Sequence, residues 1–256
     1  MIKQPVFIDT ASFPNEIRPF LQNARVYDSS CRSNATVYYL DSGFYLKVDA
    51  VGALKRESEL ARTFFESGLG PEMLLYLPEE RDYMLSRSAE GDDLTQHLDK
   101  PEMLCDVLAE ALRMLHRQPI EALPISSHMQ IFADFAANPR EEGFNAEVIP
   151  ESFGVRSAQE ALRIALENSN RLQADTLIHG DACLPNVIVK DSAFSAFIDL
   201  GMAGRGDKHI DLFWACWSLQ YNLQNEKYME RFLDAYGREA FDYELLRTVA
   251  ALDALT

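Results

Sequence analysis

β-branched and aromatic residues gather in short runs over the first third of the chain, a pattern typical of β-strands. Two such runs, at 36–40 and 43–48, are joined by a short polar connection containing Gly43, which indicates a hairpin. Apolar residues at helical spacing follow over 54–65 and stop before a Gly-Leu-Gly-Pro segment. Two more short strands are predicted at 73–76 and 82–86. This part of the chain is therefore predicted to form a small sheet with one helix.

After about residue 90 the apolar spacing changes to that of amphipathic helices. The clearest helix is predicted at 101–117, where Pro101 stands at a position that a first helical turn tolerates. Further helices are predicted at 94–98, 158–171, 212–219, 228–236 and 243–255, and short strands at 176–178, 187–189 and 194–198. We therefore predict two lobes, a β-rich one over residues 1–86 and a mainly helical one over residues 87–256.

The composition fits a globular protein of one large domain or two lobes, because 47% of the 256 residues are hydrophobic. No apolar run approaches the roughly 20 residues of a membrane helix, and the first residues lack the apolar region of a secretory signal. The four cysteines are widely spaced and include no CxxC pair, which is typical of reduced thiols. A cytoplasmic protein without a membrane partner is expected.

The charge of the chain is strongly negative. Lys and Arg number 24 and Asp and Glu 40, which gives 24 − 40 = −16. A nucleic-acid-binding protein needs the opposite sign, so no nucleic-acid partner is expected. Solubility alone can explain such a charge, but it can also attract a cationic ligand.

The segment from His179 to Asn186 carries the most specific chemical signal in the chain. It places Asp181 five positions before Asn186, and Asp199 follows thirteen positions later at the end of a predicted strand. A kinase uses one Asp to accept the proton of the acceptor hydroxyl, and an Asn and a second Asp to bind Mg²⁺. Each residue alone could be a helix cap, a turn residue or a strand end. Together they predict phosphoryl transfer, with Asp181 as catalytic base and Asn186 and Asp199 as metal ligands.

Lys47 and Glu57 are the candidates for gripping the nucleotide phosphates. Lys47 lies in a predicted strand and Glu57 in the helix that follows, an arrangement that kinases use, although a solvated ion pair has the same spacing. No GxGxxG or GxxxxGK[ST] motif is present. The candidate phosphate loop is therefore 30–34, in which Ser33 could offer a hydroxyl.

With these residues the chain resembles the aminoglycoside 3′-phosphotransferases, a family of antibiotic kinases. The resemblance is strongest at His-Gly-Asp-Ala-Cys-Leu-Pro-Asn (179–186), Phe-Ile-Asp-Leu-Gly (197–201) and Gly-Arg-Gly-Asp-Lys (204–208), and weaker over 38–40, 46–48, 56–57 and 112–116. It implies an α+β, two-lobed protein-kinase-like fold, with a small antiparallel β N-lobe and a larger, mainly helical C-lobe.

The resemblance also implies roles for individual residues. ATP would be the phosphoryl donor, with GTP as the alternative, and Mg²⁺ would be required. The nucleotide would be held by the Lys47–Glu57 pair, by the loop containing Ser33, and by backbone groups of the link from Arg87 to Ala89. Asp211 would be a structural acid that braces the catalytic loop.

The part of the sequence that would contact the acceptor departs from the family pattern. The family ends in Leu-Asp-Glu-Leu/Phe-Phe, whereas this chain has Asp253 followed by Ala254, Leu255 and Thr256. Met202 stands where an Arg is common, and Trp217 lies where relatives carry more charge. Asp253, Trp217 and Thr256 are the candidate acceptor contacts. These changes favour a less cationic or more apolar acceptor, or a weak antibiotic kinase.

The sequence therefore predicts an ATP- and Mg²⁺-dependent phosphotransferase acting on a hydroxyl of a small molecule, with an aminoglycoside 3′-hydroxyl as the leading acceptor. One alternative is a kinase of another hydroxylated compound, such as a macrolide or a metabolite. A second is a nucleotide-binding pseudokinase, against which the presence of Lys47, Asp181, Asn186 and Asp199 argues. The sequence leaves the regiochemistry, the nucleotide preference and the oligomeric state open.

Overall fold

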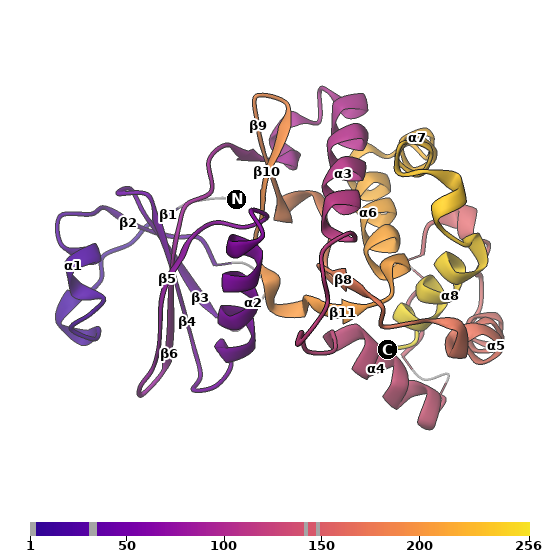
Figure 1. The fold of residues 1–256 in the computed structure, drawn as a ribbon, viewed down its shortest axis with the longest axis horizontal. Coiled ribbons are helices and arrows are strands. Elements are labelled where there is room, and N and C mark those ends of the chain that lie inside the picture. The colour runs from indigo at the N-terminus through magenta and orange to yellow at the C-terminus, as the bar shows by residue number, and fades with distance from the viewer. Residues whose placement is uncertain (1–3, 31–34, 141–142, 147–148) are drawn as a thin grey trace. The chain divides into compact units, whose positions relative to one another are not determined.

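The structure, a computed structural model, describes residues 4–30, 35–140, 143–146 and 149–256. It contains two compact units, one made of residues 1–90 and 196–201 and the other of residues 91–195 and 202–256. Figure 1 shows a sheet in the first unit and mainly helices in the second. The predicted α+β class, with an N-terminal antiparallel sheet and a helical C-terminal part, is confirmed.

The first unit is built on a six-stranded sheet in which every pairing is antiparallel. In spatial order its strands are β1 (Gln4–Pro5), β2 (Val26–Asp28), β3 (Thr36–Leu40), β4 (Phe44–Asp49), β6 (Asp82–Arg87) and β5 (Met73–Pro78). The predicted hairpin is formed by β3 and β4, and Gly43 in its connection has φ +91°, a conformation that glycine adopts without strain.

Helices cover both faces of this sheet in Figure 1. On one face, α1 (Arg18–Leu21) and the turn η1 (Thr10–Ser12) accompany a core that includes Ile17, Leu40, Leu46 and Leu85. On the other lies α2 (Lys55–Glu66), where Leu54 packs with Met73 and Met84. The two faces follow from the side-chain period of two in β-strands.

The second unit packs its helices around buried apolar stripes. The helices are α3 (Pro101–Leu115), α4 (Ser127–Ala137), α5 (Ala158–Asn168), α6 (Lys208–Leu223), α7 (Lys227–Tyr236) and α8 (Tyr243–Asp253). Leu104, Leu108, Leu112 and Leu115 of α3 are fully buried and recur at helical spacing. Helix α3 packs against α6 and α7, and α8 against α5 and α6.

Short strands position the motif of the second unit. Strand β8 (Thr176–Ile178) pairs with β11 (Gly204–Gly206) and leads into the catalytic loop, which we define as residues 179–186. Strand β9 (Val187–Lys190) follows the loop and lies between β7 (Asp92–Asp93) and β10 (Ala193–Phe197). Strand β10 spans the boundary of the two units at residues 195 and 196.

Several predicted elements differ from those observed. Residues 94–97 form the 3-10 turn η2 and not an α-helix, α5 ends in a 3-10 turn at Ser169–Arg171, and α6 begins four residues before the predicted start. Helix α4 was not predicted from the sequence. No helix in the described part of the chain is long and apolar enough to span a membrane.

Candidate active site

Strand β4 places the side chain of Lys47 on the sheet face covered by α2. Its neighbours Leu46 and Val48 are buried in the core of the opposite face, so Lys47 must point the other way. Its cross-strand partner Met84 packs with Leu54, the residue that precedes α2. The period of two thus turns Lys47 toward the helix that carries Glu57.

Lys47 forms ion pairs with two carboxylates of the first unit. Its Nζ lies 2.9 and 2.8 Å from the carboxylate oxygens of Glu57 and 2.9 Å from Oδ1 of Asp199. Burial alone would lower the pKa of Lys47, but the two carboxylates outweigh it and raise the pKa above its ordinary value. The structure therefore brings together a charged ammonium group and two of the predicted site carboxylates.

Asp199 follows β10 and lies in the segment 196–201, which belongs to the first compact unit. The backbone N–H of Phe197 donates to the carbonyl of Leu69, and the ring of Phe197 packs edge-on against Phe64. Asp199 itself has φ +59°, and 57% of its side chain is exposed. Its carboxylate can therefore meet a ligand from solvent while it contacts Lys47.

The backbone of the catalytic loop needs a glycine before Asp181. Gly180 has φ +82°, and a Cβ added there would lie 2.5 Å from the carbonyl oxygen of Met202. No side chain fits that space, because real Cβ atoms do not approach backbone so closely. The His-Gly-Asp sequence thus turns the chain sharply at the end of β8 and presents Asp181.

A buried carboxylate braces this turn. Asp211 on α6 is fully buried and accepts hydrogen bonds from the backbone N–H groups of His179 (2.8 Å) and Gly180 (2.7 Å). Burial would raise the pKa of Asp211, but its hydrogen bonds, led by that from His116, hold the pKa below the ordinary value. The carboxylate is therefore ionised and satisfies two backbone donors that would otherwise be buried without a partner.

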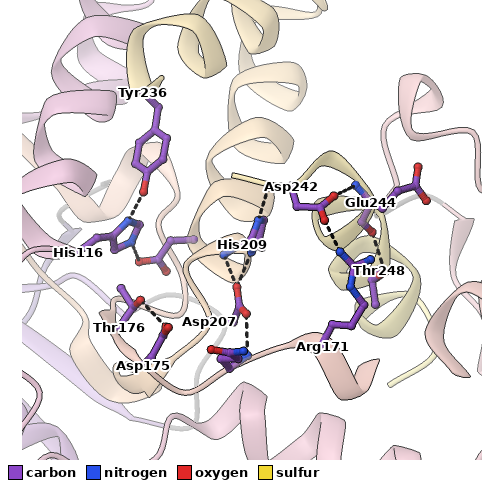
Figure 2. Close-up of polar contacts among 12 residues, drawn as sticks. His116, Arg171, Asp175, Thr176, Asp207, His209, Tyr236, Asp242, Glu244 and Thr248 are labelled. Atoms are coloured by element: carbon purple, nitrogen blue, oxygen red, sulfur yellow. Dashed lines mark hydrogen bonds and ion pairs between the residues drawn. The ribbon is translucent and has the colours of Figure 1, made fainter. Parts of the chain in front are cut away.

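His116 connects this brace to two further helices. Its Nε2 lies 3.1 Å from Oδ2 of Asp211, and its Nδ1 lies 2.9 Å from the hydroxyl of Tyr236, as Figure 2 shows for the histidine and the tyrosine. Helices α3, α6 and α7 are thus joined behind the catalytic loop. The local sequence around His116 gives no signal for its contacts with Asp211 and Tyr236, because both partners are distant in the chain.

Asn186 fixes the carboxylate of Asp181. The side-chain amide of Asn186 donates to Oδ2 of Asp181 (2.9 Å) and to its backbone carbonyl (3.0 Å). No hydrogen bond reaches Oδ1 of Asn186 within the described residues, so this oxygen is available to a metal. The loop therefore holds one carboxylate in a defined direction and presents a neutral oxygen ligand beside it.

Comparisons with known proteins identify the family. The model of the phosphotransferase enzyme family (APH) matches residues 32–249. The probable aminoglycoside 3′-phosphotransferase of Lactococcus lactis is 36% identical over 252 residues, which cover 96% of each chain. This chain belongs to the phosphotransferase enzyme family. The resemblance read from the motifs and the predicted enzyme class are thereby confirmed.

Two further relatives extend the comparison. The streptomycin 3″-kinase of Streptomyces griseus is 30% identical over 243 residues, covering 88% of this chain and 89% of the relative. The solved aminoglycoside phosphotransferase APH(3″)-Id from Streptomyces rimosus has a TM-score of 0.72 and 26% identity, over 98% of this chain and 99% of its own. That enzyme has also been solved in complex with ADP and streptomycin. The predicted kinase-like fold is confirmed.

Two predicted nucleotide contacts of this phosphotransferase lie at the end of β6. The side chain of Arg87 pairs with Glu72 at 2.9 Å and lies over the ring of Phe44. The backbone carbonyl of Ala89 accepts from the hydroxyl of Ser88 at 3.3 Å. Ser33 lies outside the described residues. The nucleotide roles of these three residues stay predictions.

The predicted acceptor contacts lie on α6 and at the end of α8. Trp217 stacks on Tyr221 with ring centroids 5.1 Å apart and touches Trp214 edge-on at 5.5 Å. Thr256 is exposed, and its hydroxyl donates to the carbonyl of Leu252. Asp253 is mostly buried, and burial together with the charge of Asp181 raises its pKa to about 7. The structure thus places Asp253 close enough to the candidate base Asp181 for the charge of Asp181 to raise the pKa of Asp253.

A polar network at the other end of α8 fixes that helix. Asp207 caps α6 by accepting from the backbone of His209 and also accepts from His209 Nδ1 at 2.5 Å. His209 Nε2 in turn accepts from the backbone N–H of Asp242, the residue that caps α8 and pairs with Arg171. Figure 2 shows these contacts joining the starts of the two helices. They fix the start of α8, the helix that ends at Asp253.

His128 lies beside the predicted acceptor residue Asp253 and accepts a hydrogen bond from Trp214, and sequence reasoning singled out neither residue for the site. His128 lies in the first turn of α4 and is buried beside Trp214 and Asp253. The sequence did contain a signal for the start of α4. Serine is a preferred N-cap residue, and Ser126 caps this helix by accepting a hydrogen bond from the backbone N–H of Met129. That signal could have located the helix, but not the partners of its histidine.

We expect Asp253→Asn to stabilise the protein more at pH 8 than at pH 5. The pKa of Asp253 is raised from 3.8 to about 7 in the folded state, so its stabilising contribution is complete only below the unfolded value and is lost as the pH rises through 7. Between pH 5 and pH 8 the wild type should lose roughly 2–3 kcal/mol relative to the variant. Urea denaturation of both proteins at the two pH values measures this difference, and a difference independent of pH would contradict it.

Proposed function

We propose that this phosphotransferase transfers the γ-phosphoryl group of ATP directly to the 3′-hydroxyl of an aminoglycoside. The observation that supports the chemistry most strongly is the fixed carboxylate of Asp181, which Asn186 orients on a backbone anchored to buried Asp211. The acceptor class comes from the printed name of the relative that is 36% identical over 96% of both chains.

Asp181 is the catalytic base in this proposal. It orients the acceptor hydroxyl and takes its proton while the hydroxyl oxygen forms a bond to the γ-phosphorus. The bond between that phosphorus and the oxygen of the departing ADP breaks in the same in-line step. No covalent enzyme intermediate is formed, and the proton leaves Asp181 to solvent after the product has departed.

Asn186 and Asp199 are the proposed ligands of Mg²⁺. Their donor atoms are an amide and a carboxylate oxygen, the hard ligands that Mg²⁺ prefers, and Asp199 is exposed enough to reach it. No group of three or more His, Cys, Asp or Glu side chains suited to a metal occurs among the described residues. A site with two protein ligands fits Mg²⁺, which keeps waters and phosphate oxygens in its coordination shell. When bound, Mg²⁺ neutralises the charge on the β- and γ-phosphates.

Lys47 is proposed to grip the phosphates, with Glu57 holding its ammonium group in place. We expect Lys47→Met to lower kcat/KM for ATP about 10- to 100-fold, because a charge-assisted hydrogen bond contributes about 1.5–3 kcal/mol. Steady-state kinetics with varied ATP measures the effect. Lys55→Met, at the exposed first position of the same helix α2, is the matched control and should leave kcat/KM unchanged. Equal kinetics in the two variants would remove Lys47 from the nucleotide site.

The acceptor is tested with a pair of compounds that differ in one hydroxyl. Kanamycin B should be phosphorylated in an ADP-release assay, and 3′-deoxykanamycin B should not, because it lacks the proposed acceptor oxygen. A macrolide and simple amino alcohols complete the screen. Turnover of both kanamycins would contradict the 3′ position, and turnover of the macrolide alone would overturn the aminoglycoside class. Failure of every acceptor, with nucleotide binding retained, would favour the pseudokinase alternative.

The 3″-hydroxyl of streptomycin is a second candidate acceptor. It is favoured by the Streptomyces griseus relative, whose printed name is streptomycin 3″-kinase and which is 30% identical over most of both chains. Streptomycin therefore belongs in the same assay. Preferential turnover of streptomycin over kanamycin B would favour this candidate over the 3′-phosphotransferase.

ATP is the proposed donor, and a competition assay with GTP tests this preference. The division into a nucleotide-binding lobe at 1–86 and a catalytic lobe at 87–256 is part of the same proposal. In it, the loop containing Ser33 and the link from Arg87 to Ala89 contribute nucleotide contacts.

A further inference from the structure

Asp82 is a buried acidic residue that the proposed reaction does not use. It begins β6 and is completely buried, and its Oδ2 accepts hydrogen bonds from the backbone N–H of Leu54 and the hydroxyl of Tyr76, both at 2.9 Å. Its Oδ1 is buried and has no hydrogen-bond partner within the part of the chain that the structure describes. The two hydrogen bonds offset part of the cost of burying a carboxyl group. The role of Asp82 therefore depends on what these two bonds hold in place.

The first bond satisfies the start of helix α2. Leu54 is the N-cap residue of this helix, and its apolar side chain makes no capping hydrogen bond. Its backbone N–H is one of the donors that the first helical turn leaves without a partner. Leu54 is only 2% exposed, so this N–H depends on an acceptor from the protein. Asp82 supplies that acceptor from a position 28 residues further along the chain.

Glu57 occupies the position from which a side chain could otherwise bind this N–H. It is the third residue of α2, and a Glu at that position can bend back to accept from the N-cap N–H in the arrangement called a capping box. In this protein both carboxylate oxygens of Glu57 instead accept from Nζ of Lys47, at 2.9 and 2.8 Å. Asp82 thus performs the capping, which leaves both oxygens of Glu57 to Lys47.

Asp82 acts from the same face of the sheet as Lys47. Strands β4 and β6 pair so that Lys47 lies opposite Met84, and Asp82 precedes Met84 by two residues. Tyr76 lies opposite Met84 on β5 and shares this face. Burial, together with the hydrogen bond to Asp82, raises the pKa of Tyr76 to about 12, so its hydroxyl remains a donor at neutral pH. Asp82 therefore ties the start of α2 to β5 and β6, less than one helical turn before Glu57.

We propose that Asp82 is a positioning residue for nucleotide binding: by capping α2, it keeps Glu57 available to hold Lys47 against the nucleotide phosphates. The inference rests on the proposed function, because it needs Lys47 to grip those phosphates. Without an acceptor at position 82, the N–H of Leu54 is buried and unsatisfied, and Glu57 is the side chain of α2 placed to accept from it. Glu57 then turns away from Lys47, whose ammonium group keeps only its contact with Asp199.

The central test is the affinity of Asp82→Ala for MgATP, titrated without an acceptor. We expect the Kd to rise about five- to tenfold, a part of the loss expected for Lys47→Met, because the lysine remains but is no longer held in place. Asp82→Asn should stay within about twofold of the wild type, since asparagine keeps an oxygen that can accept from Leu54 and Tyr76. Glu80→Ala, at an exposed acidic position in the β5–β6 turn, is the control and should leave the Kd unchanged.

Two comparisons separate positioning from stability. Tyr76→Phe removes the other hydrogen bond of Asp82 but leaves the cap, so the urea midpoint should fall while the Kd for MgATP stays within about twofold. In a Lys47→Met background, Asp82→Ala should change the Kd by less than about twofold, because its effect passes through the lysine. A merely structural role of Asp82 would weaken binding by the same factor in both backgrounds.

A further variant carries the test if Asp82→Ala does not fold. Asp82→Val combined with Tyr76→Phe replaces both side chains by apolar groups of similar volume, which a buried site tolerates, and valine suits a strand. Of the three groups that form the hydrogen bonds at Asp82, only the N–H of Leu54 then remains, without its acceptor. This double variant should show the same five- to tenfold rise in the Kd for MgATP.

The outcomes distinguish this inference from the proposed function. If Lys47→Met weakens MgATP binding and Asp82→Ala does not, Asp82 has no positioning role. A loss in Asp82→Asn as large as that in Asp82→Ala would also overturn the inference, because it would mean that the charge matters and the cap does not. If MgATP binds but no aminoglycoside is phosphorylated, the proposed acceptor fails, and the titrations still decide this inference. If Lys47→Met binds MgATP as the wild type does, the gripping role of Lys47 and this inference both fail.

Discussion

Replacing Asp181 with alanine is expected to abolish phosphoryl transfer to the acceptor while the affinity for ATP stays within about twofold. A positioned general base contributes about 10²–10⁴-fold to the rate, so kcat should fall by that factor. ATP binding should survive because the proposed phosphate contact Lys47, and Glu57 that holds its ammonium group, belong to a different compact unit from Asp181. Single-turnover kinetics and a separate nucleotide titration measure the two quantities.

A second variant, Asp181→Asn, removes the base and keeps a hydrogen-bond acceptor for Asn186 in the catalytic loop. Asp181→Ala also deprives the Asn186 amide of its side-chain acceptor, whereas Asp181→Asn keeps an oxygen at that position. Both variants should lose the same factor in kcat if proton acceptance is the role of Asp181. Asp191→Asn is the control, because this exposed aspartate in the β9–β10 turn has φ +50°, a conformation that asparagine also tolerates. Wild-type turnover by Asp181→Asn would disprove the base assignment.

Removing Asp211 is expected to cost both stability and activity. Asp211→Ala leaves the backbone N–H groups of His179 and Gly180 buried without their acceptor, and it separates His116 from its carboxylate. The loss of one partner from such a buried network costs about 3–5 kcal/mol. Chemical denaturation should show this decrease in the free energy of unfolding, and kcat should fall because the turn that presents Asp181 loses its anchor.

The contribution of Asp211 to the free energy of unfolding should depend on pH in a defined direction. Because the folded pKa of Asp211 lies below its ordinary value of 3.8, its stabilising contribution is present above that pH and is lost as the pH falls below it. The difference between wild type and Asp211→Ala should therefore shrink in acid. Asp134→Ala, an exposed aspartate on α4, should change stability by less than about 0.5 kcal/mol. Similar unfolding free energies for the Asp211 and Asp134 variants would show that the carboxylate of Asp211 does not stabilise the catalytic loop.

The local sequence predicted the elements whose signals lie within a few residues. The β3–β4 hairpin follows from two β-branched runs around a glycine turn, and α3 follows from leucines at helical spacing after a proline. The motif from His179 to Asn186 predicted the reaction class, because phosphoryl transfer needs particular side chains at a particular spacing. Helix α4 was not predicted because its apolar residues do not form a strong stripe along one face. The N-cap Ser126 was the main signal for it.

By itself, the sequence therefore determined the family, the reaction class and the lysine–glutamate spacing of the first unit. Only the tertiary structure decided which distant residues support the chemistry. His116 reaches Asp211 across 95 positions, and Trp214 reaches His128 across 86. Periodicity and motif spacing report on neighbours along the chain, whereas the protonation and hydrogen bonding of a buried group depend on whatever folding packs against it. That is why the raised pKa of Asp253 and the buried contacts of His128 follow from the fold and not from the order of the residues.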